Sequence, residues 1–241
     1  MQVLKEAIEY NIPHISTTVL MILVVWFIIL ILFLAVSRKI SVIPSKLQGF
    51  FEIIFEFIIN LADEIIGSDA VKYYPLFLGI FFFILVANLI GIIPGLVSPT
   101  SNINIPLSLA VIVFIYYNVQ GFLKYKLSYF RHFIIPGLPF WMLPINILVF
   151  FIEIISQFVR PFSLTLRLFC NIFAKETLLG VLGLLIITFF SLSGVLKLIV
   201  IMPLILRPFI ILLAVLIGLV QAFIFLILSI VYVAGAVKME H

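Results

Sequence analysis

Five long stretches without a single charged side chain are the feature that most restricts how this chain can fold. They are residues 15–36, 73–123, 133–152, 177–196 and 208–237. A helix needs about 20 apolar residues to cross the hydrocarbon core of a bilayer. A soluble core does not require such uninterrupted stretches, and only 10% of this chain is charged, against about 25% in soluble domains. We therefore expect an all-α integral membrane protein.

Turn-forming residues divide these stretches into about five membrane-spanning helices. Gly91–Pro106 is rich in Gly, Pro, Ser and Asn, and Ser191–Gly194 separates the last two helices. The expected spans lie within one membrane domain, 1–241, at 15–36, 74–94, 105–123, 144–190 and 195–237. The last two are about 63 Å long, twice the hydrocarbon thickness, so we expect steep tilting, protrusion, or bending at Pro161 and Pro208.

Residues 44–67 are expected to form a separate amphipathic helix at the cytoplasmic membrane interface. Glu52, Glu56, Asn60 and Asp63 recur there at helical spacing, among Phe, Ile and Leu. This acidic row is either a solvated face or a contact with a partner subunit. Basic faces are usual for binding lipid, so the acidic charge slightly favours a protein over lipid as the contact.

The distribution of Lys and Arg predicts the orientation of the chain in the membrane. Basic residues follow the first and third spans, at Arg38, Lys39, Lys46, Lys124, Lys126 and Arg131. The loop after the second span has no charge. The N-terminus is therefore expected outside and the C-terminus in the cytoplasm, with Lys238 in agreement and Lys197 as an exception. The initial Met and the absence of a transit peptide favour a bacterial inner membrane, and an organellar membrane stays an alternative.

A stripe of polar side chains runs along the expected fourth span. Its members are spaced by three or four residues, namely Glu153, Ser156, Arg160, Ser163, Arg167 and Asn171. At 100° per residue, all six lie within about 40° of Arg167 on an ideal helix. Glu176 lies on the opposite side of the same helix, and Gln221 is an isolated amide in the last span.

Arg167 is the member of this stripe that lies deepest in the apolar sequence. A charge at the centre of a bilayer costs at least about 2.5–3.5 kcal/mol on insertion scales. Arg160 can extend its side chain toward the interface, whereas Arg167 cannot do so easily. Arg167 therefore needs a carboxylate, water, or both, and the alternatives are a charge on an ion pathway and a structural arginine.

Cofactor and metal chemistry find little support in the sequence. The single cysteine, Cys170, excludes a disulfide framework and a thiolate metal cluster. There is no HExxH motif and no Gly-rich phosphate loop. We expect no catalytic residues, no cofactor, no metal and no nucleic-acid partner. Ion-conducting bundle, secondary transporter and membrane-embedded enzyme stay open, although internal repeats typical of transporters are not visible.

Several motifs together resemble subunit a of the F-type ATP synthases. Residues 163–176 read Ser-Leu-Thr-Leu-Arg-Leu-Phe-Cys-Asn-Ile-Phe-Ala-Lys-Glu, and 221–232 read Gln-Ala-Phe-Ile-Phe-Leu-Ile-Leu-Ser-Ile-Val-Tyr. Pro-Ser-Lys-Leu-Gln at 44–48 and Asn-Leu-Ile-Gly-Ile-Ile-Pro at 88–94 match in order and spacing. The resemblance extends from about residue 20 to the end of the chain.

The resemblance implies a proton-translocating stator subunit of a rotary ATP synthase. In that family the arginine at the position of Arg167 faces the membrane-embedded carboxylates of a ring of c subunits, between two offset half-channels. The positions of Glu176, Gln221 and Asn171 belong to the polar pathway, which we extend to Glu153, Ser156 and Ser163. The implied partners are the c ring, the peripheral-stalk b subunits, membrane lipid and the translocated protons. One departure is Ala214, where many relatives have an ionisable residue.

Overall fold

The computed structural model describes residues 17–37, 45–93, 95–126, 143–191 and 198–238, and every regular element in these ranges is a helix. The α-helices are α2 (Thr17–Ser37), α3 (Lys46–Ile66), α4 (Tyr74–Ile90), α5 (Asn104–Tyr125), α6 (Leu143–Phe190) and α7 (Ile201–Val237). Two short 3₁₀ helices, η1 (Ser68–Tyr73) and η2 (Pro99–Ser101), precede α4 and α5. Five of these described helices are long and apolar enough to cross a membrane. The expected all-α membrane fold is thereby confirmed.

Two helices differ from their expected ranges by more than two residues at one end. α4 ends at Ile90, before the expected 94, because the chain turns at Gly91. A Cβ atom on Gly91 would lie 2.7 Å from the Ser98 Cβ, so only glycine allows the following loop to approach so closely. α7 begins at Ile201, after the expected 195, and half of that difference, residues 195–197, lies outside the described residues. Arg38, Lys39, Arg131 and Lys197, which the orientation argument used, also lie outside them.

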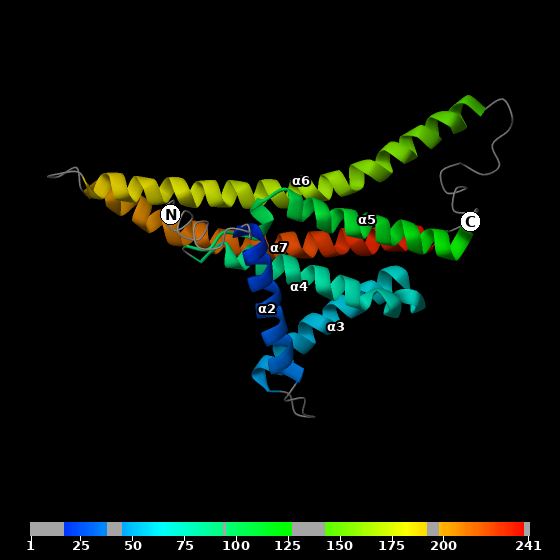
Figure 1. The fold of residues 1–241 in the computed structure, drawn as a ribbon, viewed down its shortest axis with the longest axis horizontal. Coiled ribbons are helices and arrows are strands. Elements are labelled where there is room, and N and C mark those ends of the chain that lie inside the picture. Colours follow the sequence, from blue (N-terminus) through cyan, green and yellow to red (C-terminus); the bar gives the residue numbers. More distant parts are fainter. Residues whose placement is uncertain (1–16, 38–44, 94, 127–142, 192–197, 239–241) are drawn as a thin grey trace.

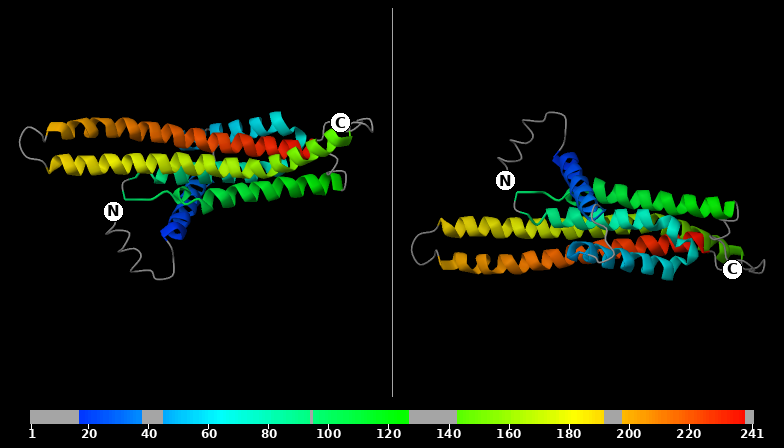
Figure 2. Two further views of the ribbon diagram at one scale, coloured as in Figure 1. Left: turned by 90° about the horizontal axis from the view of Figure 1, so that it is seen from above. Right: turned by 90° about the horizontal axis from the view of Figure 1, so that it is seen from below.

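The long helices α6 and α7 lie side by side and antiparallel along the length of the molecule (Figures 1 and 2). α4 and α5 run alongside them, and α2 crosses the direction of this bundle (Figure 1). The span that contains α4 is the most enclosed, because 61% of its most apolar 18-residue stretch is buried, against 11% for α2. The core therefore sits around α4, and α2 presents most of its surface to the surroundings.

The lengths of the helices determine how the bundle fits a bilayer. α2 has 21 residues, so it is about 32 Å long and matches the roughly 30 Å hydrocarbon core. α6 has 48 residues and would reach about 72 Å. Because α2 runs across α6 and α7 in Figure 1, a bilayer that α2 crosses directly must be crossed by the long pair at a steep tilt.

The amphipathic helix α3 has clear local signals at both ends. The Ser45 side chain accepts a hydrogen bond from the Gln48 backbone N–H at its start. The helix ends at Ile66 and is followed by Gly67, whose φ of +84° favours glycine. One face packs on the bundle, and Phe57 contacts Phe223 of α7 with ring centroids 5.6 Å apart. The predicted acidic residues of α3 are all exposed.

Candidate functional site

The predicted polar stripe lies along one edge of α6. Its six members, Glu153, Ser156, Arg160, Ser163, Arg167 and Asn171, are all half-buried. On one side of them α6 is buried, as at Leu164 and Leu168, and on the other side it is exposed, as at Phe162 and Leu166. The stripe therefore follows the border between the packed face and the outward face of α6, where a side chain can reach either.

The stripe meets α7 at two points along the seam between the helices. The Asn171 amide donates a hydrogen bond of 2.8 Å to the Gln221 side-chain oxygen. Eleven residues away along each helix, the Arg160 guanidinium lies over the Tyr232 ring, 5.4 Å from its centroid. The Gln221 Nε2 is buried and has no hydrogen-bond partner among the described residues. Within the described part of the chain, a donor thus lies unused at the seam beside Asn171.

Arg167 lies between these two contacts. Within the described part of the chain, its guanidinium makes no hydrogen bond and no ion pair. It is seven residues from Arg160 and nine from Glu176, or about 10 and 14 Å along the helix axis. Within the described residues this charge is thus uncompensated, and it lies on a border that another molecule can touch.

A cluster of polar groups, the Arg160 cluster, lies on the N-terminal side of Arg167. Arg160 pairs with Glu153 at 3.3 Å, and both side chains are half-buried. The Tyr117 hydroxyl of α5 donates to the Gln157 side-chain oxygen at 2.7 Å. The Tyr117 ring lies 5.9 Å from the ring of Tyr232. Three helices therefore bring polar groups together at this level of the bundle.

A second cluster, the Glu176 cluster, lies on the C-terminal side of Arg167. The Glu176 carboxylate accepts a hydrogen bond from the Ser98 backbone N–H at 3.1 Å. The neighbouring Lys175 is 7% exposed and donates to the Asn88 backbone oxygen at 3.0 Å. The Asn88 side chain in turn donates to the Gly218 carbonyl of α7 at 3.1 Å. Glu176 thus faces the loop before α5, away from the stripe.

The segment around η2 closes the Glu176 cluster. The Ser98 hydroxyl donates to the Ala87 carbonyl at 2.8 Å and lies 2.6 Å from the Thr100 hydroxyl. Thr100 donates to the Asn88 side-chain oxygen at 3.2 Å. Asn88, Ser98 and Thr100 are all buried. This loop is therefore a packed part of the site, held by polar contacts to α4.

Sequence reasoning singled out seven residues, and the structure adds others beside them. It joins Asn171 to Gln221 and Glu153 to Arg160, while Ser156 and Ser163 make no hydrogen bond within the described residues. Tyr117, Gln157 and the buried position of Lys175 were missed. All three are polar residues within otherwise apolar spans, and this feature could have identified them although they lie outside the stripe.

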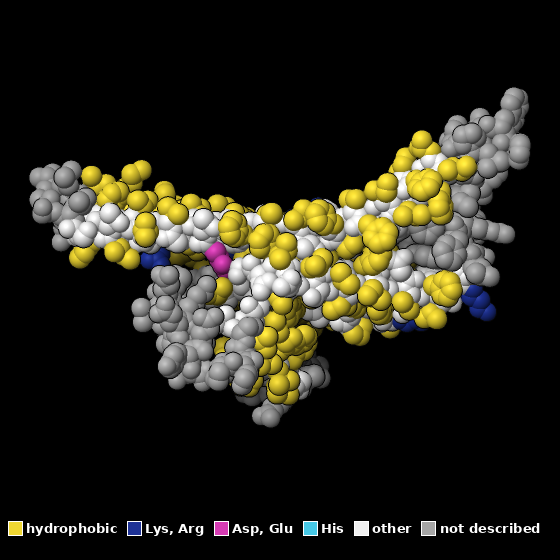
Figure 3. Space-filling view, turned by 45° about the horizontal axis from the view of Figure 1, so that its top comes forward, with side chains coloured by type: hydrophobic (Ala, Val, Ile, Leu, Met, Phe, Trp, Pro, Cys, Tyr) yellow, Lys and Arg dark blue, Asp and Glu magenta, His cyan; other side chains and the backbone are white. Residues whose placement is uncertain are grey.

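The outward face of α6 and α7 is apolar over most of its length. Figure 3 shows hydrophobic side chains gathered along this long edge of the molecule and few charged ones between them. Exposed members include Phe162 at 60% on α6 and Leu212 at 69% on α7. Within the described residues, no group of three or more His, Cys, Asp and Glu could hold a metal ion. The site is therefore a charged seam beside an apolar surface.

Comparison with known proteins gives a consistent result. The sequence profile of the family described as ATP synthase A chain matches residues 18–234. ATP synthase subunit a of Sulfurihydrogenibium sp. is 40% identical over 168 residues, which cover 70% of this chain and 79% of that protein. The subunit a of Aquifex aeolicus is 38% identical over 211 residues, 87% of this chain and 92% of that protein. The subunit a of Solidesulfovibrio magneticus is 42% identical over 160 residues, 65% of each chain.

Proposed function

The chain belongs to the ATP synthase A chain family, and from this premise we propose that it conducts protons between two half-channels past a ring of c subunits. Membership makes it the multi-pass membrane subunit a of an F-type ATP synthase. The proposal includes the proton path, the contact with the ring, the peripheral-stalk b subunits as partners, and the orientation with the N-terminus outside.

The observation that carries the proposal is the uncompensated charge of Arg167. Burying a guanidinium in a membrane protein is costly unless another charge or water accompanies it. Arg167 finds no acidic partner within the described residues and lies at the border of the outward face. A carboxylate supplied by another membrane subunit would satisfy it there, which is what a c subunit carries in this family.

The two polar clusters support separate access routes on either side of Arg167. We assign the Glu176 cluster to the outer half-channel and the Arg160 cluster, with Glu153, to the cytoplasmic one. Along α6, Arg167 lies about 10 Å from Arg160 of one cluster and about 14 Å from Glu176 of the other. The unused Gln221 donor and the half-buried Ser156 and Ser163 offer further hydrogen bonds to water along the seam.

The charge of Arg167 explains why protons would follow the ring. A ring carboxylate that faces lipid must be neutral, because a bare charge there is costly. Opposite a guanidinium the charged form is favoured, so the carboxylate releases its proton into one half-channel as it meets Arg167. It regains a proton from the other after it has passed. The same positive charge repels a proton that would cross directly between the half-channels.

The cytoplasmic side of the proposed assembly includes α3. Its acidic residues Glu52, Glu56 and Asp63 are exposed, so this row is available to a basic partner segment such as one of the peripheral stalk. The amphipathic character of α3 supports a position at the membrane surface. Lys124 and Lys238 lie at the C-terminal ends of α5 and α7, and their positive charges agree with a cytoplasmic location of these ends under the positive-inside rule.

Substitution of Arg167 tests the proposal directly. In inverted membrane vesicles containing the assembled complex, Arg167→Ala should abolish ATP synthesis and ATP-driven proton pumping. It should also allow a passive leak, because the positive charge that repels a directly crossing proton is removed. Each proton that leaks through 100 mV dissipates about 2.3 kcal/mol. Arg167→Lys should fail or be severely impaired, because a buried lysine can lose its proton and an arginine cannot.

Arg207 offers a matched control. It is another half-buried arginine in an apolar helix, but it lies within two turns of the start of α7, where its side chain can reach the interface. Arg207→Ala should keep synthesis and pumping. An assembled Arg167→Ala complex with normal ATP synthesis would overturn the proposed mechanism.

Disulfide cross-linking tests the ring contact separately. The exposed native Cys170 is first replaced by serine. Cysteine at Ser156 or Asn171 should then cross-link to a cysteine on the outward-facing helix of a c subunit. Cysteine at Thr165, which is 2% exposed, should not. Equal cross-linking from all three positions would remove the stripe from the ring interface.

A further inference from the structure

α6 carries three cations within its apolar sequence, and the protein itself engages two of them. They are Arg160, Arg167 and Lys175. Lys175 is 7% exposed and donates to the Asn88 carbonyl of α4, and Arg160 pairs with Glu153 at 3.3 Å. Within the described residues Arg167 has no such partner. A ring carboxylate that passes α6 therefore meets one free charge only as long as the other two stay engaged.

Arg160 is the second cation that a ring of c subunits can reach. It lies on the same stripe as Arg167, seven residues and about 10 Å away along α6. It is half-buried and follows the exposed Val159. The steep tilt of the long pair places α6 largely along the plane of the membrane, in which a ring turns. A carboxylate that leaves Arg167 toward the start of α6 therefore approaches Arg160 next.

A bare charge at Arg160 would hold such a carboxylate in the wrong state. A guanidinium within about 4–6 Å shifts the protonation equilibrium of a carboxylate about 10- to 1000-fold toward the charged form. A ring carboxylate must regain its proton before it turns into lipid, because a bare charge there is costly. A free Arg160 would therefore create a second place where the carboxylate stays charged, and the ring would stall.

The pairing with Glu153 draws the Arg160 side chain away from Arg167. Seven residues separate Glu153 from Arg160, so the two lie within about 20° of each other around the helix and about 10 Å apart along it. Their side chains can meet at 3.3 Å only when both extend along α6 toward each other. The Arg160 guanidinium is therefore directed toward the start of α6, whereas Arg167 lies toward its end.

An aromatic ring of α7 covers the same guanidinium. The centre of the Tyr232 ring lies 5.4 Å from Arg160, a distance at which the face of an aromatic ring attracts a cation. Tyr232 lies 5.9 Å from the ring of Tyr117, whose hydroxyl donates to Gln157 at 2.7 Å. The contacts thus run from Arg160 through α7 and α5 and back to α6, and they hold Tyr232 beside the guanidinium.

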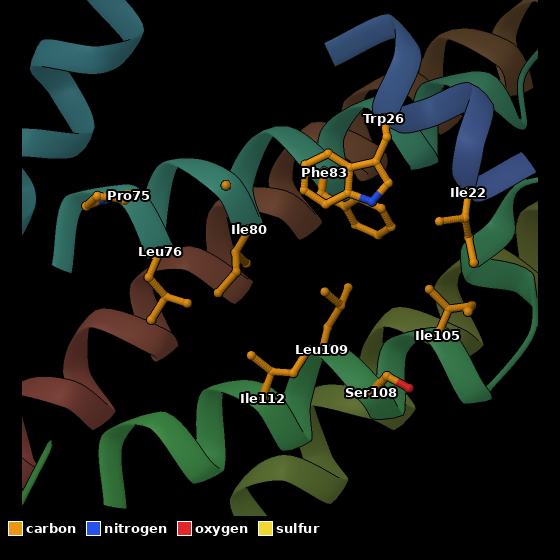
Figure 4. A pocket seen from close by; sticks show the side chains of 11 residues that line it. Ile22, Trp26, Pro75, Leu76, Ile80, Phe83, Ile105, Ser108, Leu109 and Ile112 are labelled. Atoms are coloured by element: carbon orange, nitrogen blue, oxygen red, sulfur yellow. The ribbon is translucent and has the colours of Figure 1, made fainter. Parts of the chain in front are cut away.

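Glu153 is the one acidic side chain that pairs with Arg160 in the described part of the chain. The apolar cavity of about 360 Å³ between α2, α4 and α5 offers no alternative, because neither a charged side chain nor any residue of α6 lines it. Figure 4 shows Ile80 of α4 and Leu109 of α5 pointing into this cavity. Compensation of Arg160 within these residues therefore depends on Glu153 and on the ring of Tyr232.

We propose that Glu153 and Tyr232 mask Arg160 from the ring, so that Arg167 is the only cation of α6 that a passing carboxylate meets. This inference rests on the proposed function and gives Glu153 a particular role in the cytoplasmic half-channel. Glu153 is a fixed counter-charge there and does not itself carry protons. Its removal is therefore harmful only while Arg160 remains positive.

The experiment compares variants in inverted membrane vesicles, with the content of c subunits in the purified complex as the check on assembly. Glu153→Gln should slow ATP-driven proton pumping at least about tenfold, the lower end of the shift in protonation. ATP hydrolysis should fall with it, because a stalled ring stops both. Addition of Arg160→Gln should recover most of the loss. Arg207→Gln, added to Glu153→Gln as the matched control, should recover nothing.

The aromatic part of the mask has its own test. Tyr232→Phe keeps the ring face that attracts the guanidinium, and Tyr232→Leu removes it. The leucine variant should therefore pump more slowly than the phenylalanine variant, and Arg160→Gln should narrow the difference between them.

Four results would overturn the masking of Arg160. Normal pumping by Glu153→Gln would show that an unpaired Arg160 does not disturb the ring. A loss that Arg160→Gln leaves unrepaired would make Glu153 a proton carrier, and equal repair by Arg207→Gln would indicate a general effect of charge. Equal pumping by the two Tyr232 variants would also contradict it, and this comparison decides if Glu153→Gln does not assemble. All these variants keep Arg167, so their failure leaves the proposed function intact, which Arg167→Ala tests separately.

Discussion

Replacing Asn88 by alanine should destabilise the chain, although Asn88 lies on one of its most apolar spans. The side chain is fully buried, donates to the Gly218 carbonyl at 3.1 Å and accepts from Thr100 at 3.2 Å. Side-chain hydrogen bonds between membrane helices average about 0.6 kcal/mol and reach about 1.7 kcal/mol. Loss of both should therefore lower the free energy of unfolding by about 1–3 kcal/mol.

The measurement is unfolding of the purified chain in mixed micelles as the fraction of SDS is raised, followed by tryptophan fluorescence. The expected loss corresponds to an unfolding equilibrium constant about 5 to 150 times larger. Thr188→Ala is the control, because the exposed Thr188 hydroxyl bonds only to the Leu184 carbonyl one turn earlier in its own helix. Its effect should stay below about 0.5 kcal/mol.

A change for Asn88→Ala no larger than that of the control would refute the reasoning. It would mean that the contacts of Asn88 add nothing to packing between α4, the η2 segment and α7. A larger loss, above about 4 kcal/mol, would also disagree, since two hydrogen bonds in a membrane protein do not account for it.

Two further substitutions probe the seam and the Arg160 cluster. Tyr117→Phe removes the 2.7 Å hydrogen bond to Gln157; it should cost about 1 kcal/mol in micelle unfolding and slow proton flow in vesicles, and unchanged flow would separate Tyr117 from the pathway. Gln221→Leu removes a buried donor that has no partner among the described residues and breaks the bond from the half-buried Asn171. Its stability should stay within about 1 kcal/mol while proton pumping falls, and the reverse pattern would argue for a purely structural amide.

Much of the fold could be predicted because hydrophobic length is a local property of the sequence. The apolar stretches predict five spans, and α6 and α7 are long, as their uninterrupted helical pattern indicates. The end of α4 was harder, because the turn depends on Ser98 approaching Gly91 from seven residues away. The transverse path of α2 depends on packing between helices, which no single span encodes.

The candidate site could also be predicted only in part. Helical periodicity places Arg167 and Asn171 on one face, because that requires only the angle per residue. It does not say which helix lies opposite. The contact of Glu176 with Ser98 joins residues 78 apart, and that of Lys175 with Asn88 joins residues 87 apart. Such pairings follow from the tertiary arrangement, so the Glu176 cluster could not be assembled from sequence spacing.

The contact between Asn88 and Gly218 also has a consequence for the time course of biosynthesis. Its two residues are 130 apart in the chain, and ribosomes add about 5–20 residues each second. Gly218 is therefore synthesised about 7–26 s after Asn88. During that interval the nascent α4 carries a polar group without this partner in the bilayer. A chain that stalls or is truncated before residue 218 keeps the Asn88 amide without this carbonyl partner.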